Sequence, residues 1–145
     1  MDTEAIYQAL FDKVRTLYSF PVAQRRLRVV DVLPHADTPA LFQVQDDMEL
    51  YPIQERSMLG AKRPVKCQLH VNLLIYATAS PTTFAVQELN PVLDAILSAF
   101  GHGEAETLGG LVLDCKIGGK VRFSENTKSS MVAAIIPIEI LAISK

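Results

Sequence analysis

The stretch "VKCQLHVNLLIYAT", residues 65–78, has the clearest period in the chain. Apolar side chains occupy every second position from Val65 to Ile75, and polar side chains alternate with them from Lys66 to Asn72. Successive side chains of a β-strand point to opposite faces of its sheet, so this alternation predicts a strand with one buried and one solvated face. A sheet of this kind needs a second layer to cover its apolar face.

Two segments with helical spacing can provide that layer. Residues 3–18 carry apolar side chains at helical intervals, and Asp2 or Thr3 can cap the exposed amides. Residues 80–100 show the same spacing, with Ser80 as a cap and proline at the first helical position. Because Pro91 removes one helical hydrogen bond, this second segment is either kinked near Asn90 or consists of two abutting helices.

The other strands are expected on both sides of this central unit. Residues 25–33 and 40–50 are rich in β-branched and apolar side chains and predict a hairpin around the connection "PHADTP". Three consecutive antiparallel strands are predicted at 111–117, 120–124 and 131–143.

Two details constrain these last strands. Gly118 and Gly119 predict a turn between the first two of them. The final run is apolar on both faces and contains Pro137, which cannot donate to a ladder and therefore predicts an edge position or a bulge. The order helix, three strands, helix, three strands predicts an α+β fold, a mostly antiparallel sheet with two helices on one face, in one domain spanning residues 1–145.

Composition limits the functional classes. The formal net charge of −2 gives no long-range attraction to a polyanion, and 49% hydrophobic residues are usual for a globular protein. The start "MDTEAIYQALFDKV" has acids where a signal peptide carries positive charge, and no apolar run approaches the roughly 18 residues of a membrane span. We therefore expect a chain that stays in the cytoplasm where it is made and does not enter a membrane.

The residues with reactive side chains form no recognisable catalytic pattern. Cys67 and Cys115 could form one disulfide, but a reducing compartment and their place in apolar runs favour two buried thiols. Cys115 as a nucleophile would need a lowered pKa and a base, and the sequence identifies none. The glycine pairs in "TLGGLVLDCKIGGKV", residues 107–121, lack the phosphate-loop spacing and are typical of turns.

The remaining polar residues do not converge on a site either. His35, His70 and His102 lack metal-ligand spacing, so no metal site is expected. The basic clusters near Arg25 and Lys62 have no interleaved aromatic side chains for stacking bases, and solvation or an acidic protein surface explains them better than nucleic acid.

One acidic cluster and one irregular stretch are left. Asp46, Asp47 and Glu49 lie at a strand end, where alternation places Asp47 and Glu49 on one face as a solvated patch. The stretch "YPIQERSMLGAKRP", residues 51–64, predicts a long exposed loop, either functional or a hairpin tip without a partner.

A series of segments in this order resembles a known protein family. The segments are "RRLRVVDVLP", "PALFQVQ", "LHVNLLIYAT", "LNPVLDAI", "TLGGLVLDCKIGGKV" and "AAIIPIEIL", and together they span nearly the full chain. This series resembles the tail terminator, or tail completion, proteins of long-tailed bacteriophages, the lambda U-like group of minor tail proteins. No single motif is diagnostic, and the ordered series carries the resemblance.

The resemblance implies a structural virion protein without a cofactor or a catalytic site. Proteins of this family form a hexameric ring at the head-proximal end of the tail tube, which stops tube polymerisation and offers a surface for the head connector or neck protein. DNA passes through such a ring without specific binding. The implied location is the virion tail, with assembly in the bacterial cytoplasm.

By the same analogy, particular residues become candidates for contacts. The loop would reach the tube or a neighbouring subunit, and its candidate interface residues are Tyr51, Gln54, Glu55, Arg56, Met58, Lys62 and Arg63. Asp46, Asp47 and Glu49 would form an acidic lumen patch that repels passing DNA. The alternatives are a head-completion or neck adaptor protein and a small cytoplasmic enzyme that uses Asp114, Cys115 or a histidine.

Overall fold

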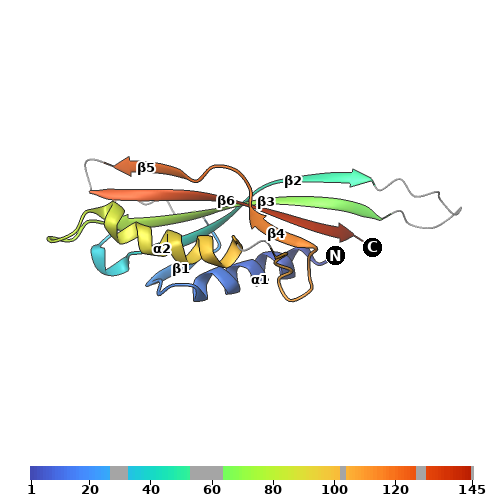
Figure 1. The fold of residues 1–145 in the computed structure, drawn as a ribbon, viewed down its shortest axis with the longest axis horizontal. Coiled ribbons are helices and arrows are strands. Elements are labelled where there is room, and N and C mark those ends of the chain that lie inside the picture. The colour runs from blue at the N-terminus through green and yellow to red at the C-terminus, as the bar shows by residue number, and fades with distance from the viewer. Residues whose placement is uncertain (27–32, 53–63, 102–103, 127–129, 145) are drawn as a thin grey trace, which may run out of the picture.

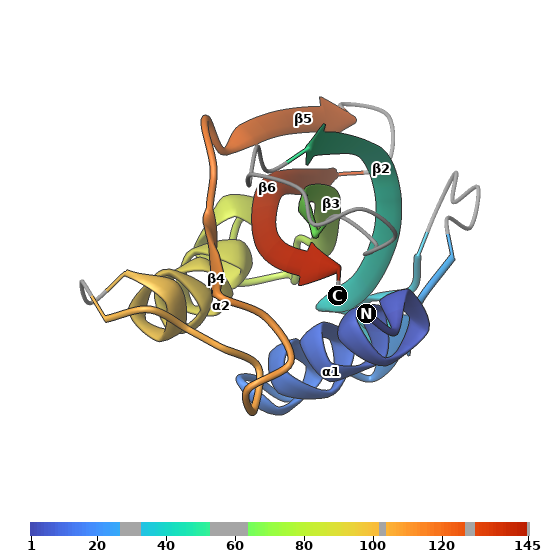
Figure 2. The same ribbon diagram turned by 90° about the vertical axis from the view of Figure 1, so that its right-hand side faces the viewer.

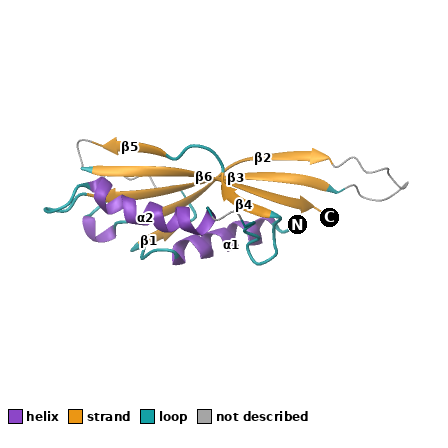
Figure 3. Ribbon diagram, in the orientation of Figure 1, coloured by secondary structure: helices purple, strands orange, loops and turns teal. Residues whose placement is uncertain are grey.

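The computed structural model describes residues 1–26, 33–52, 64–101, 104–126 and 130–144 (Figure 1). In chain order the elements are α1 (Thr3–Thr16), β1 (Val22–Gln24), the short 3-10 helix η1 (His35–Asp37), β2 (Ala40–Pro52), β3 (Val65–Thr78), α2 (Ala85–Phe100), β4 (Asp114–Ile117), β5 (Arg122–Asn126) and β6 (Met131–Ser144). The two helices lie on one face of a sheet that is mostly antiparallel (Figure 3). The predicted α+β class is confirmed.

The two longest strands form the centre of the sheet. β3 and β6 pair antiparallel along their whole length, from Val65 opposite Ser144 to Thr78 opposite Met131. The strand order is β1-β2-β3-β6-β4, and β5 pairs with β6 beside β4. Viewed along the strands, the sheet curls strongly, with β2 on one side of the central pair and β5 on the other (Figure 2). The expected alternation in β3 is confirmed, because Cys67, Leu69 and Val71 are buried whereas Lys66 is exposed.

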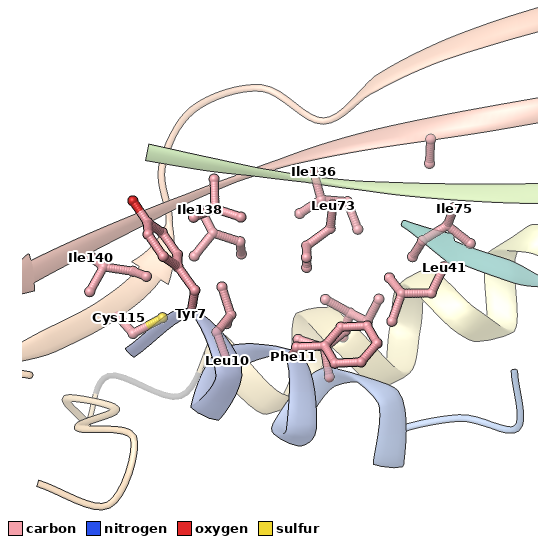
Figure 4. Close-up of a cluster of buried hydrophobic side chains, with 14 of the residues drawn as sticks. Tyr7, Leu10, Phe11, Leu41, Leu73, Ile75, Cys115, Ile136, Ile138 and Ile140 are labelled. Carbon is pink, nitrogen blue, oxygen red and sulfur yellow. The ribbon is translucent and has the colours of Figure 1, made fainter. Parts of the chain in front are cut away.

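The helices pack their apolar faces onto this central pair. The N-terminus of α1 is capped as expected, since the amide of Ala5 donates to Asp2 Oδ1 at 3.0 Å. Leu10 and Phe11 of α1 point at the isoleucines and leucines of the sheet (Figure 4). The helical members of this core are Ile6, Tyr7, Leu10, Phe11, Val14, Leu89, Val92, Leu93 and Ile96.

A buried amide also ties α1 to the sheet. Gln43 of β2 is 2% exposed, and its Nε2 donates to the backbone carbonyl of Tyr7 at 2.9 Å. A buried amide without a partner would be costly, so this bond favours one position of the helix over β2.

Most of the first strand of the predicted hairpin, 25–33, lies outside the described residues, which leave out 27–32. β1 ends at Gln24 and runs parallel to β2, and Arg25 and Arg26 lie in a bend. Arg25 turns towards α1: its Nη1 donates to Gln8 Oε1 at 2.9 Å, and its guanidinium also pairs with Glu4. Contacts with the helix thus hold the first residue of the predicted strand in a bend.

The second helix starts later than predicted. The hydroxyl of Ser80 closes a turn by accepting from the amide of Thr83 at 3.0 Å, and the helix begins at Ala85. The side-chain Oε1 of Gln87 accepts from the amide of Phe84 at 2.9 Å. Pro91 is exposed within one continuous helix, so the alternative of two abutting helices is wrong.

The C-terminal strands depart furthest from the prediction. Residues 108–110 have positive φ, so the chain turns there and β4 starts at Asp114. β4 and β5 do not pair with each other but lie one after the other along β6, which excludes the expected hairpin. The amide of Gly118 instead donates to the carbonyl of Pro137 at 3.0 Å.

Pro137 lies within the sheet, without a bulge, so the expected edge position or bulge is wrong. Its neighbours on β6 pair with β3 on one side. On the other side, the residues of β6 up to Ile135 pair with β5, and those from Ile138 onward pair with β4. The N and carbonyl of one residue in an antiparallel strand point to the same side. Because the carbonyl faces Gly118, the missing amide donor falls in the gap between β5 and β4, where no strand requires it.

Candidate functional site

The polar side chains gather on the face of the sheet that lies away from the helices. We call this surface the open face; its side chains come from β2, β3 and β6 and are Asp46, Asp47, Glu49, Tyr51, Lys66, Gln68, His70, Asn72 and Glu139. The predicted lumen residues Asp46, Asp47 and Glu49 therefore do share one surface. Alternation along a regular strand would place only Asp47 and Glu49 there.

A β-bulge brings Asp46 to the open face. The register shifts between Gln45, which pairs with Val71, and Met48, which pairs with Leu69. Asp46 and Asp47 thus lie opposite the single residue His70, which is the pattern of a bulge. The sequence alternation alone gave no sign of this extra residue.

The bulge is held by side chains of β3. Asp47 Oδ1 hydrogen-bonds His70 Nδ1, and Asn72 Nδ2 donates to Asp46 Oδ2 at 3.5 Å. His70 Nε2 is buried and has no hydrogen-bond partner within the described part of the chain. His70 and Asn72 are therefore members of the acidic cluster that the sequence analysis did not connect with it.

Glu49 and Tyr51 form a second pair on the open face. The hydroxyl of Tyr51 donates to Glu49 Oε2, and this hydrogen bond to the carboxylate raises the pKa of the tyrosine above its usual value. Tyr51 was expected in the loop but belongs to β2. The other predicted interface residues, Gln54, Glu55, Arg56, Met58, Lys62 and Arg63, lie outside the described residues.

Glu139 closes the open face against the segment that leaves β4. A Cβ added to Gly118 would lie 2.2 Å from Glu139 Cγ, so only glycine leaves room for this side chain. A groove of about 440 Å³ extends from this point to Lys120 and Arg122 and reaches Asp46 on its other wall. A second groove, of about 480 Å³, runs between Tyr51 and Lys116. Lys116, Lys120 and Arg122 thus border the acidic side chains of the open face.

The thiols and histidines do not form a catalytic centre within the described residues. Cys67 and Cys115 are free and buried, which confirms the two thiols and rules out the disulfide. Burial, with the charge of Glu106 as a second cause, raises the pKa of Cys115 to about 12, the opposite of an activated nucleophile. His35 Nε2 lies 3.6 Å from Glu88, and His102 is outside the described residues.

Two other kinds of site, a metal centre and a membrane-spanning helix, have no candidate among the described residues. No group of three or more His, Cys, Asp or Glu side chains within the described ranges is arranged to hold a metal ion. None of the helices so described has both the length and the apolar character needed to cross a bilayer.

Large apolar side chains are exposed on the second half of β2 and, elsewhere, on β5 and before α2. These elements lie at opposite ends of the long strands (Figure 1). At one end, Met48 and Leu50 of β2 are 43% and 59% exposed, because the helices do not extend under this part of the strand. At the other end, Phe84 before α2 and Phe123 on β5 are 76% and 55% exposed. Large exposed apolar side chains that cluster in this way are typical of contact surfaces.

Comparisons with known proteins add little to this picture. No family model matches the chain, and no curated protein matches it. One solved structure, whose name states no function, aligns over 97% of this chain and 96% of its own, with a TM-score of 0.47 and 17% identity. A likeness at this level carries no argument about function.

Proposed function

We propose that this protein is a structural virion protein that forms a ring at the head-proximal end of a phage tail tube. The ring stops tube polymerisation and provides the surface that joins the tail to the head connector or neck protein. The proposal rests on the ordered series of segments that resembles the tail terminator family. The chain acts as a homo-oligomer, a hexamer by the same resemblance, and needs no cofactor.

One structural observation carries the proposal: the two exposed apolar patches differ from each other. The patch at Met48 and Leu50 lies on a strand end, and the patch at Phe84 and Phe123 lies beside the start of α2. A ring built from one kind of subunit needs two unlike surfaces that fit each other, because each contact is head-to-tail. One domain with two unlike apolar surfaces meets that requirement.

The open face suits the lining of such a ring. Asp46, Asp47 and Glu49 give it negative charge, and like-charge repulsion would keep passing DNA from binding to the wall. The helices on the other face would then lie outside. This arrangement assigns the lumen patch to the bulge and to the strand end that follows it.

Two experiments test the proposed function. Native mass spectrometry of the protein released from purified tail tubes should find hexamers, and a persistent monomer in the presence of tubes would contradict the ring. Electron microscopy of particles that lack the protein should show overlong or unjoined tails. Leaking heads with normal tails would instead identify a neck adaptor.

A further inference from the structure

The exposed half of β2 has a backbone edge that no described strand occupies. β1 pairs with this edge only from Ala40 to Phe42, and no other described strand pairs with it between Gln43 and Pro52. The opposite edge of β2 is occupied by β3 down to Val65. A strand edge with free amides and carbonyls is a template for another strand, and proteins normally cover or disrupt such edges.

The two faces of this strand end have different chemistry. Met48 and Leu50 pair with Leu69 and Cys67 and lie on the helix side of the sheet, where both are exposed. Glu49 pairs with Gln68 and lies on the open face. A strand that added here would therefore meet apolar side chains on one face and acidic side chains on the other.

β5 has the complementary alternation. The run from Lys120 to Phe123 reads basic, apolar, basic, apolar. Arg122 pairs with Ile135 and lies on the open-face side, whereas Phe123 pairs with the buried Ala134 and lies on the helix side. β5 pairs only with β6 among the described strands, so its outer edge is also unused.

The charges of this segment have no ion-pair partner among the described residues. Arg122 lines the groove that contains Asp46, but neither Lys120 nor Arg122 forms an ion pair with any described residue. Phe123 is likewise more than half exposed. A partner strand with an acidic and an apolar face would match both side chains at once.

We propose that the exposed half of β2 pairs edge to edge with β5 of a second copy of this chain. When two sheets join with their faces aligned, Phe123 comes to lie beside Met48 and Leu50, and Arg122 comes to lie beside the acids around Glu49. The contact joins two unlike edges, so each copy can make it twice, once with β2 and once with β5. This inference rests on the proposed ring and assigns its subunit contact.

Charge reversal tests the contact without disturbing the core. Glu49→Lys and Arg122→Glu should each weaken self-association on tail tubes by at least about fivefold, since each turns an attraction into a repulsion. The double variant Glu49→Lys with Arg122→Glu should restore it. Asp94→Lys, on the exposed side of α2, is the matched control and should leave association unchanged. Circular dichroism would establish that every variant is folded.

Mixing the two single variants gives a sharper result. The β2 edge of Glu49→Lys matches the β5 edge of Arg122→Glu, and the reverse contact joins the original Glu49 and Arg122, so both contacts between unlike variants are attractive. Contacts between two copies of the same variant join charges of the same sign. An equimolar mixture should therefore restore rings in which the two variants alternate, with equal numbers of each in native mass spectra. Failure of both the double variant and the mixture to restore rings would overturn the proposed pairing.

The outcomes also separate this inference from the proposed function. If either single variant formed rings normally, the proposed contact between β2 and β5 would be wrong, and the proposed terminator function would still stand. The variants could instead self-associate in solution as their charges predict and yet not bind tail tubes. This result would support the contact between β2 and β5 and contradict the terminator function.

Discussion

Placing an acid at Val71 tests the assignment of the two faces of β3. Val71 is 1% exposed and lies in the core between β3, β6 and the helices. Its replacement by aspartate removes about 1.5 kcal/mol or more of apolar burial. The buried carboxyl must also stay protonated at pH 7, which is roughly three units above the reference pKa of aspartate. At about 1.4 kcal/mol for each unit, this costs about 4 kcal/mol more. The loss of about 6 kcal/mol would exhaust the stability of many domains of this size.

Chemical denaturation followed by far-ultraviolet circular dichroism measures this loss, since the chain has no tryptophan. Val71→Ala isolates the loss of packing, and Gln68→Asp places the same acid on the open face of the same strand. Because burial raises the pKa of the introduced acid, its penalty is absent below about pH 4 and grows as the pH rises. Val71→Asp should therefore approach Val71→Ala at low pH. A Val71→Asp variant as stable as Gln68→Asp at neutral pH would refute the face assignment.

Three further predictions concern single contacts. Lys13 Nζ lies 2.5 Å from Glu106, and this hydrogen-bonded ion pair lowers the pKa of the carboxyl. Glu106→Gln should therefore cost about 1 kcal/mol of unfolding free energy at pH 7. It should cost nothing at a pH well below 4, where the carboxylate is protonated. Denaturant titrations measure both values, and equal losses at the two pH values would contradict this prediction. Gly118→Ala should cost about 1 kcal/mol because its Cβ displaces Glu139, and the cost should vanish in a Glu139→Ala background; an additive double-mutant cycle would exclude the clash. Cys115 should react with a thiol reagent no faster than the protein unfolds, given its burial and a pKa near 12; rapid native labelling, located by peptide mass spectrometry, would be the opposite result.

The sequence predicted those elements whose pattern is local and regular. Apolar and polar side chains alternate along β3, and β6 is apolar over most of its length. α1 has an amphipathic repeat and a capping aspartate. In these segments every residue favours the same state, so tertiary contacts did not change it. Their boundaries agree with the structure within a few residues.

The predictions failed where contacts distant in sequence outweighed the local pattern. Arg25 pairs with α1 and lies in a bend where the local pattern predicted a strand. The glycines at 118 and 119 looked like a hairpin turn, but the amide of Gly118 bonds Pro137 and sends the chain along β6. Neither partner can be found from the spacing of the residues themselves.

The candidate site shows the same division. Composition and alternation were enough to place Glu49 and Asp47 on a polar strand face. The bulge that adds Asp46, the bond from Asp47 to His70, and the hollow that Phe84 shares with Glu125 of β5 depend on strand register. Register is a property of two strands together, and one strand's sequence does not contain it.

By itself, then, the sequence determined the α+β class, the two helices, the central strands and the burial of both thiols, because these follow from periodicity and hydrophobicity within single segments. Only the tertiary structure decided the parallel pairing of β1, the placement of β4 and β5 along one strand, the position of Pro137 at their junction, and the edges of β2 and β5 that no described strand occupies. These features arise from the pairing of segments far apart in the chain, whose backbone hydrogen bonds do not depend on which side chains they carry.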